Sequence, residues 1–174
     1  GKFPLPLRNH GNLPKGEYTD FIGLNYYTRS SVSGIGDGVR EGSPRNDLDW
    51  EIYPQGIADC AQQLYRVLPR PIWVTENGTC DNNDRFRCKY LYEHLEVISR
   101  SPLPFARYYH WCFCDNFEWV EGNTAKFGLV RIDPQTKQRF VKASGDFYSD
   151  VIRQGGVTQE CYEKYVAKQE YDVR

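Results

Sequence analysis

Three short apolar runs that alternate with stretches of helical periodicity constrain the fold of this chain more than any other feature. The apolar runs are rich in β-branched and aromatic residues and predict buried strands over residues 20–27, 71–75 and 106–114. Apolar residues spaced three and four apart predict helices over residues 54–68, 87–99 and 142–153. Such alternation predicts an α/β fold with parallel strands and helices packed outside them.

The segments between and around these elements are polar. Residues 1–17 are predicted to be an irregular lead-in, residues 30–50 a long loop, and residues 155–174 a polar tail. Loops as long as residues 30–50 are often functional. We interpret residues 1–174 as a single structural unit whose three strands are too few to close a barrel.

Charge and hydropathy exclude several classes of function. The chain carries 22 Lys and Arg against 23 Asp and Glu and shows no basic stripe, so we expect no nucleic-acid partner. No apolar run approaches the roughly 20 residues that span a bilayer. Residues 1–10 lack the apolar segment of a signal peptide, which makes a cytoplasmic location the default expectation.

The cysteines indicate neither a metal centre nor a disulfide framework. None of the six forms a C-x-x-C pair or has a closely spaced histidine, so we predict no metal site and no cofactor. Buried, reduced thiols are the expected state, with Cys80 and Cys88 as candidates for exposure because they lie in a polar stretch.

Polar and aromatic side chains gather where each predicted strand ends. These clusters span residues 25–29, 75–78 and 111–119. Active sites of barrels built from alternating strands and helices lie at the C-terminal ends of the strands. We therefore expect the three clusters to converge on one site.

The residue types in these clusters suit chemistry on a sugar. Glu76 directly follows an apolar strand, where a carboxylate needs hydrogen bonds, and the phenol of Tyr27 is a candidate donor. A carboxylate held ionised in this way can attack an anomeric carbon. Trp111 and Trp119 offer flat apolar faces, and Glu118 can accept hydrogen bonds from two hydroxyls.

Each of these residues also has a structural interpretation. A glutamate after a strand, such as Glu76, is most often solvated or a helix cap, and Trp111 taken alone fits a core position. Tyr26 is interpreted as an ordinary strand residue. His94 and His110 are interpreted as structural histidines with satisfied hydrogen bonds.

The ordered set of motifs resembles glycoside hydrolase family 1. Residues 20–28 are similar to the motif on the family's sixth barrel strand, residues 75–78 to its nucleophile motif on the seventh, and residues 111–119 to its eighth-strand motif. The resemblance runs from about residue 18 to about residue 153 and is specific because the motifs keep their order and spacing. It implies a partial (β/α)8 TIM barrel containing strands six to eight.

The resemblance also implies catalytic roles. Glu76 would be the nucleophile of a retaining β-glycosidase, Tyr27 would hydrogen-bond and tune it, and Asn25 would help to order the carboxylates. The implied substrates are β-glucosides or β-galactosides.

Four further positions would bind the sugar. Glu118 and Trp119 would bind its outer hydroxyls, Trp111 would form the stacking platform, and Phe127 would close one side. A carboxylate at Glu118 would repel a phosphate, which favours plain sugars over phosphosugars.

The chain departs from the family pattern most in what it lacks. A complete barrel needs at least about 250 residues, and the acid/base Asn-Glu-Pro motif of the fourth strand does not occur here. Asp115 is the only substitute acid, but it matches a structural position. We therefore expect the chain to be inactive alone and to require a partner, either the missing N-terminal barrel portion or another copy of itself.

Three interpretations of the chain remain open at the level of sequence. It is a piece of a β-glucosidase-type enzyme, a non-catalytic sugar-binding or partner-binding remnant of one, or a degenerate half-barrel. The absence of methionine, with Gly1 at the first position, suits the first and third interpretations equally. An intact Glu76 weighs against the second, since binding alone does not need a buried nucleophile.

Overall fold

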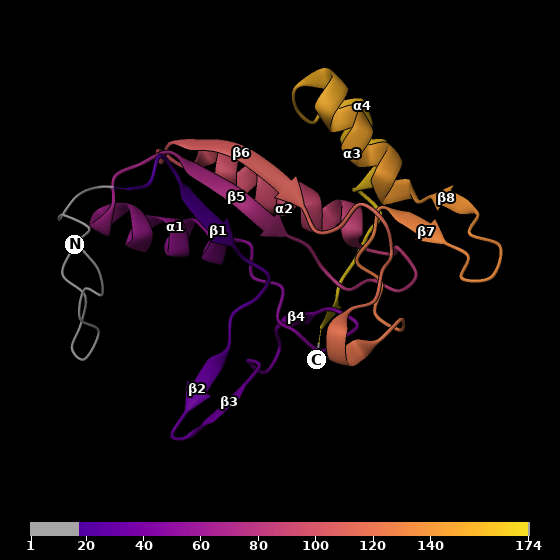
Figure 1. The fold of residues 1–174 in the computed structure, drawn as a ribbon, viewed down its shortest axis with the longest axis horizontal. Helices are drawn as coiled ribbons and strands as arrows, with labels where there is room; N and C mark the ends of the chain where they lie inside the picture. The colour runs from indigo at the N-terminus through magenta and orange to yellow at the C-terminus, as the bar shows by residue number, and fades with distance from the viewer. Residues whose placement is uncertain (1–17, 174) are drawn as a thin grey trace.

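A three-stranded parallel sheet forms the centre of the protein. The computed structural model describes residues 18–173, so the predicted lead-in over residues 1–17 lies outside the described residues. The sheet contains β1 (Ile22–Asn25), β5 (Ile72–Asn77) and β6 (Phe105–His110) in the order β1-β5-β6 (Figure 1). All three predicted strands and their parallel arrangement are therefore confirmed.

Two helices connect these strands and cover one face of the sheet. Helix α1 (Gln55–Val67) follows the β1 region and α2 (Arg87–Arg100) follows β5, and both lie on the same side of the sheet (Figure 1). The buried side chains of the strands pack against α1 in one apolar cluster: Ile22, Leu24, Tyr26, Ile57, Ala61, Ile72 and Val74. Burying each large aliphatic side chain contributes about 1.5–3 kcal/mol. The helical periodicity of residues 54–68 is thus confirmed, except that Leu64 is exposed.

The opposite face of the sheet is open among the described residues. Gly23 and Asn25 of β1 and Tyr109 of β6 are exposed there, as the strand alternation requires. Trp73 stacks on Phe21 with ring centroids 4.0 Å apart. Within residues 18–173, the helices therefore cover one face of the sheet and leave the other face uncovered.

The C-terminal third of the chain forms a second layer beside the sheet. It contains the hairpin of β7 (Val130–Ile132) and β8 (Arg139–Val141), then α3 (Ala143–Gln154) and α4 (Gln159–Tyr165) (Figure 1). These helices pack against α2 through a second cluster of buried residues: Cys88, Leu91, Leu129, Phe147, Cys161 and Val166. The predicted helix over residues 142–153 is confirmed.

The segment predicted as a polar tail over residues 155–174 contains regular structure. Helix α4 begins after Thr158, whose hydroxyl accepts a hydrogen bond from the amide of Cys161. The short strand β9 (Asp172–Val173) then pairs with β4 (Pro44–Arg45). Cys161 and Val166 are buried, and these two apolar side chains within a polar sequence fix the segment to the core.

Two predicted boundaries also change. The loop over residues 30–50 contains β4 and an antiparallel hairpin of β2 (Ser31–Ser33) and β3 (Gly36–Gly38). The third strand ends at His110 rather than at residue 114, because from Cys112 onward the backbone pairs with the segment 127–130 instead of with β5. The Trp111–Cys112 peptide bond is cis.

The expectation that Cys80 and Cys88 are exposed is wrong, since both are fully buried. Burial raises the pKa of the Cys80 thiol to about 11 and that of Cys88 to about 12. Both residues therefore behave as small core residues. Within residues 18–173, no helix combines the length and apolar character needed to cross a membrane.

His94 predicts a loss of stability in mild acid. It is fully buried in α2, its Nδ1 donates to the Tyr90 carbonyl at 2.8 Å, and its Nε2 has no hydrogen-bond partner among the described residues. Burial lowers the pKa of His94 to about 4, below the roughly 6.5 of an unfolded histidine. The unfolded chain therefore binds the proton first, and the contribution present above pH 6.5 is lost as the pH falls toward 4.

Between pH 7 and pH 5, we expect this histidine to lower the free energy of unfolding by about 2 kcal/mol. Urea denaturation at both pH values, repeated on His94→Gln, measures its share. A variant that loses as much stability as the natural chain over this range would contradict the assignment.

Candidate active site

The C-terminal ends of the three parallel strands border a pocket of about 350 Å³. Six of the seven residues predicted for the site line this pocket: Tyr27, Glu76, Trp111, Glu118, Trp119 and Phe127. They come from the ends of β1, β5 and β6 and from the segment 111–127 that follows β6. The expected convergence of the three polar clusters is what the structure shows.

Glu76 is the second-last residue of β5, the sheet's central strand, and is half-buried. The hydroxyl of Tyr27 donates to its Oε2 at 2.6 Å, across from β1. Burial, together with the neighbouring Glu76 carboxylate, raises the pKa of Tyr27, so this phenol keeps its proton and remains a donor. The bond occupies one carboxylate oxygen of Glu76 and orients the other.

Asn25 is the predicted site residue that does not join the pocket. Its side chain is exposed, and its Oδ1 accepts a hydrogen bond from Thr75 Oγ1 at 2.6 Å. The alternation of β1 directs Asn25 to the open face of the sheet, whereas Tyr27 follows the strand. Among the described residues, the Asn25 side chain therefore makes no hydrogen bond to a carboxylate that would support its expected role in ordering the carboxylates.

Glu118 forms the opposite wall of the pocket. It is 8% exposed, and Trp111 Nε1 donates to its Oε1 at 3.2 Å. Burial raises the pKa of Glu118, while the hydrogen bonds from Trp111 and Asn116 oppose that rise. The adjacent Trp119 is 78% exposed, begins the 3-10 turn η1 (Trp119–Glu121), and has a positive φ of 51°.

Sequence reasoning missed part of an aromatic wall. The ring of Trp50 lies 6.3 Å from that of Tyr27 and 5.9 Å from that of Phe127, and Leu48 lines the pocket beside them. These two residues lie in the loop predicted over residues 30–50, where no periodicity singles them out. Val120 also lines the pocket. The one signal in the sequence for this wall is a tryptophan, Trp50, at the end of a polar loop.

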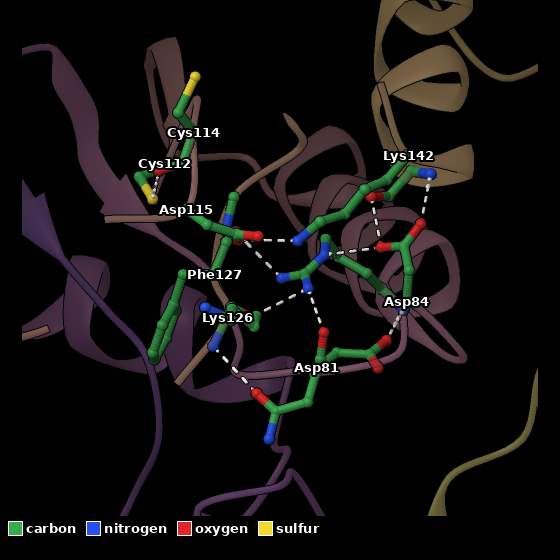
Figure 2. Close-up of polar contacts among 12 residues, drawn as sticks. Asp81, Asp84, Cys112, Cys114, Asp115, Lys126, Phe127 and Lys142 are labelled. Carbon is green, nitrogen blue, oxygen red and sulfur yellow. Dashed lines mark hydrogen bonds and ion pairs between the residues drawn. The ribbon is translucent and has the colours of Figure 1, made fainter. Parts of the chain in front are cut away.

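Asp115 anchors the base of the segment that carries Glu118. Its Oδ1 accepts hydrogen bonds from the Gly128 amide at 2.9 Å and from Lys142 Nζ at 2.8 Å (Figure 2). The Asp115 and Lys142 side chains are 4% and 11% exposed. Asp115 is thus engaged in an ion pair outside the pocket lining, which supports the structural interpretation over a role as substitute acid.

Buried Arg87 holds residues 126–127, at the end of the segment that carries Glu118. Its guanidinium donates to the carbonyls of Lys126 and Phe127, each at 3.0 Å, and to Asp84 Oδ1 at 2.9 Å. Figure 2 shows Asp84, Lys126 and Phe127 around this network. Two cations from the α2 and α3 regions thereby fix the loop that forms one side of the pocket.

A carboxylate–phenol pair thus lies at the C-terminal end of a parallel sheet, faced by tryptophan and a second carboxylate. The family model described as Glycosyl hydrolase family 1 matches residues 12–157. The chain belongs to this family.

Among its relatives is the β-galactosidase of Saccharolobus solfataricus, 32% identical over 160 residues. That alignment covers 81% of this chain and 33% of the relative, so the chain spans about a third of the length of the curated relatives it matches.

Solved structures agree with this assignment. A β-glycosidase from Pyrococcus horikoshii superposes with a TM-score of 0.76 at 30% identity, covering 84% of this chain and 37% of that one. The β-glucosidase from Thermotoga maritima in complex with glucoimidazole gives a TM-score of 0.71 at 32% identity, over 79% of this chain and 35% of that one. The sequence-based assignment to the family is confirmed.

Proposed function

We propose that this chain supplies the nucleophile side of a retaining β-glycosidase that acts on β-glucosides or β-galactosides. The observation that carries the proposal is the 2.6 Å bond from Tyr27 to Glu76 in a pocket shared with Trp111 and Glu118. The relatives' names, β-galactosidase and β-glucosidase, support the substrate class.

In this proposal, Glu76 attacks the anomeric carbon. The bond between that carbon and the leaving oxygen breaks, the leaving oxygen takes a proton from an acid, and a glycosyl-enzyme ester forms at Glu76. Water, deprotonated by the same group, then releases the sugar with retained configuration. Tyr27 O–H holds one oxygen of Glu76 so that the other faces the pocket.

The sugar itself is held by the residues around this carboxylate. Glu118 accepts hydrogen bonds from sugar hydroxyls, with Trp111 Nε1 fixing its orientation at 3.2 Å. Trp111 and Trp119 supply apolar faces for the ring, and Phe127 closes the side next to Glu76. The negative charge at Glu118 disfavours a phosphorylated sugar.

The acid comes from outside this chain. Retaining hydrolysis needs a second carboxyl group about 5–5.5 Å from the nucleophile, and Asp115 is held by Lys142 instead. We therefore propose that the chain is inactive alone and completes its site with a partner, either the remaining barrel portion or another copy. The open face of the sheet, where Asn25 and Tyr109 are exposed, supports such a partner.

Hydrolysis of an aryl β-glucoside by the chain, with Glu76→Gln as the control, tests this proposal. We expect no turnover by the chain alone. We expect Glu76-dependent turnover, and a shift to a larger particle in size-exclusion chromatography, when an N-terminal barrel portion is added. Turnover by the chain alone that Glu76→Gln abolishes would contradict the need for an outside acid, and complementation that survives Glu76→Gln would contradict the nucleophile.

A further inference from the structure

The last residues of the chain, beyond the part that matches the family, form a strap over α2. We define the C-terminal strap as residues 167–173. The Tyr171 ring packs edge-on against Phe86 with centroids 5.7 Å apart, and its hydroxyl donates to Glu93 Oε2 at 2.7 Å. The Gln169 side chain accepts the amide of Lys89 at 2.9 Å. Two side chains thus fix the strap along the first turns of α2.

The strap ends on the segment that carries the Trp50 wall of the pocket. Strand β9 pairs with β4, with Val173 opposite Pro44 and Asp172 opposite Arg45. Tyr171 also packs on the buried cluster that contains Ile52. The strap therefore contacts the residues on both sides of the turn over residues 46–50.

The turn is also held by bonds within itself and by the segment 80–82. The Asn46 side chain accepts the amides of Leu48 and Trp50 at 2.9 and 3.0 Å, and the Asn46 amide donates to the Trp50 carbonyl at 3.0 Å. The Asp47 amide donates to the Cys80 carbonyl at 3.2 Å, and Asp47 Oδ2 accepts the Asn82 amide at 2.7 Å. Asp47 receives Arg85 Nη2 at 3.2 Å, and the same nitrogen reaches Asp172 at 3.3 Å. One guanidinium thus joins the strap directly to the turn.

We propose that Tyr171 and Asp172 are positioning residues, through which the C-terminal strap holds Trp50 against Tyr27 and Phe127 in the pocket. Tyr171 anchors the strap, β9 supports β4, and Asp172 shares Arg85 with the turn. The use of this wall in sugar binding rests on the proposed function, whereas the coupling of strap to wall does not.

Fluorine NMR of the chain labelled with 5-fluorotryptophan tests this coupling. The chain has 4 tryptophans, so four resonances report separately on it, and Trp50→Phe assigns one of them. Removing residues 169–174 is expected to shift the Trp50 resonance, because its ring loses the fixed contacts with Tyr27 and Phe127. Trp73, on the open face of the sheet, is expected to stay unchanged.

Two matched substitutions cover the case in which the shortened chain fails to fold. Asp172→Asn removes the charge facing Arg85 but keeps the side-chain shape, and we expect a smaller shift of the same resonance that Asp172→Glu reverses. Glu163→Gln, an equal charge change at an exposed position of α4, is expected to leave the Trp50 resonance unmoved.

An unmoved Trp50 resonance in a shortened chain that retains the Trp73 signal would overturn the proposal. If shortening shifts all four resonances together, the Asp172→Asn variant decides between the outcomes. An unmoved Trp50 resonance in that variant would also overturn the proposal. The NMR measurement needs neither sugar nor turnover, so a failure of the proposed function leaves it intact. Weaker binding of glucoimidazole by the shortened chain is expected only if both proposals hold.

Discussion

Arg87→Met is expected to lower the free energy of unfolding by about 4 kcal/mol. Arg87 is fully buried at the start of α2, and its guanidinium makes five hydrogen bonds. One goes to the carboxylate of Asp84. The other four go to the main-chain carbonyls of Thr79, Asp81, Lys126 and Phe127. Methionine fills a similar volume but donates to none of them.

The free energy of unfolding falls because the substitution leaves buried hydrogen-bond acceptors without their charged donor. The Thr79 carbonyl loses its charged donor, and an unsatisfied buried acceptor costs about 1–3 kcal/mol. The Phe127 carbonyl also loses a charged donor but keeps the Cys112 amide at 3.3 Å. Asp84 keeps the amide and hydroxyl of Ser144, so this carboxylate is not stranded. Arg87→Lys retains the charge, but an ammonium is a compact point charge without the planar fork that spans four carbonyls. We expect it to recover only part of the loss.

Urea denaturation measures this effect, with Arg66→Met as the matched control. Arg66 lies in the last turn of α1, is exposed, and contributes mainly through the helix dipole, so its loss should cost less than about 1 kcal/mol. Equal losses for the two variants would show that the Arg87 network does not stabilise the fold. A destabilised Arg87→Lys that recovers nothing would point to side-chain packing rather than charge.

The fold was predictable where one physical requirement acts on neighbouring residues. Strands β1 and β5 bury alternate side chains against α1, so each strand appears in the sequence as a short apolar run. The spacing of Ile57 and Ala61 indicates the helix in the same way. The end of β6 was not predictable in this way, because aromatic residues continue after His110 while the backbone partner changes, from Cys112 onward, from β5 to the segment 127–130.

The motifs predicted most residues of the site. The prediction was incomplete where a segment distant in sequence supplies a side chain. Tyr27, Glu76 and Glu118 stand at strand ends and converge as the topology requires. Trp50 lies in a loop that is placed by contacts with distant segments, among them the pairing of β4 with β9 between residues more than 120 positions apart. Local periodicity carries no information on such a pairing.

Gly78→Ala is expected to destabilise the chain by about 3 kcal/mol or more. A Cβ at Gly78 would overlap the carbonyl oxygen of Trp111, which is backbone and cannot rotate away as a side chain would. The amide of Trp111 donates to the Asn77 carbonyl at 2.9 Å, so the two segments are already joined at this point. Relief requires moving one of them.

Asn77 resists that movement from the Glu76 side. It is fully buried, its Nδ2 donates to the Tyr26 carbonyl at 2.7 Å and to Tyr90 at 2.9 Å, and its Oδ1 accepts from Tyr108 at 2.8 Å. The strain therefore falls on Trp111 and on its 3.2 Å bond to Glu118. We expect the near-ultraviolet circular dichroism of the tryptophans to change along with the melting temperature.

Gly38→Ala is the matched control for this last substitution. A Cβ at Gly38 meets no atom within 4 Å, and its φ is not positive, so we expect a change of less than about 1 kcal/mol and an unaltered near-ultraviolet spectrum. A Gly78→Ala chain as stable as Gly38→Ala would contradict the close approach of the two backbones. A chain that loses stability while keeping the tryptophan spectrum would show instead that β5 yields, moving Glu76 rather than the Trp111 platform.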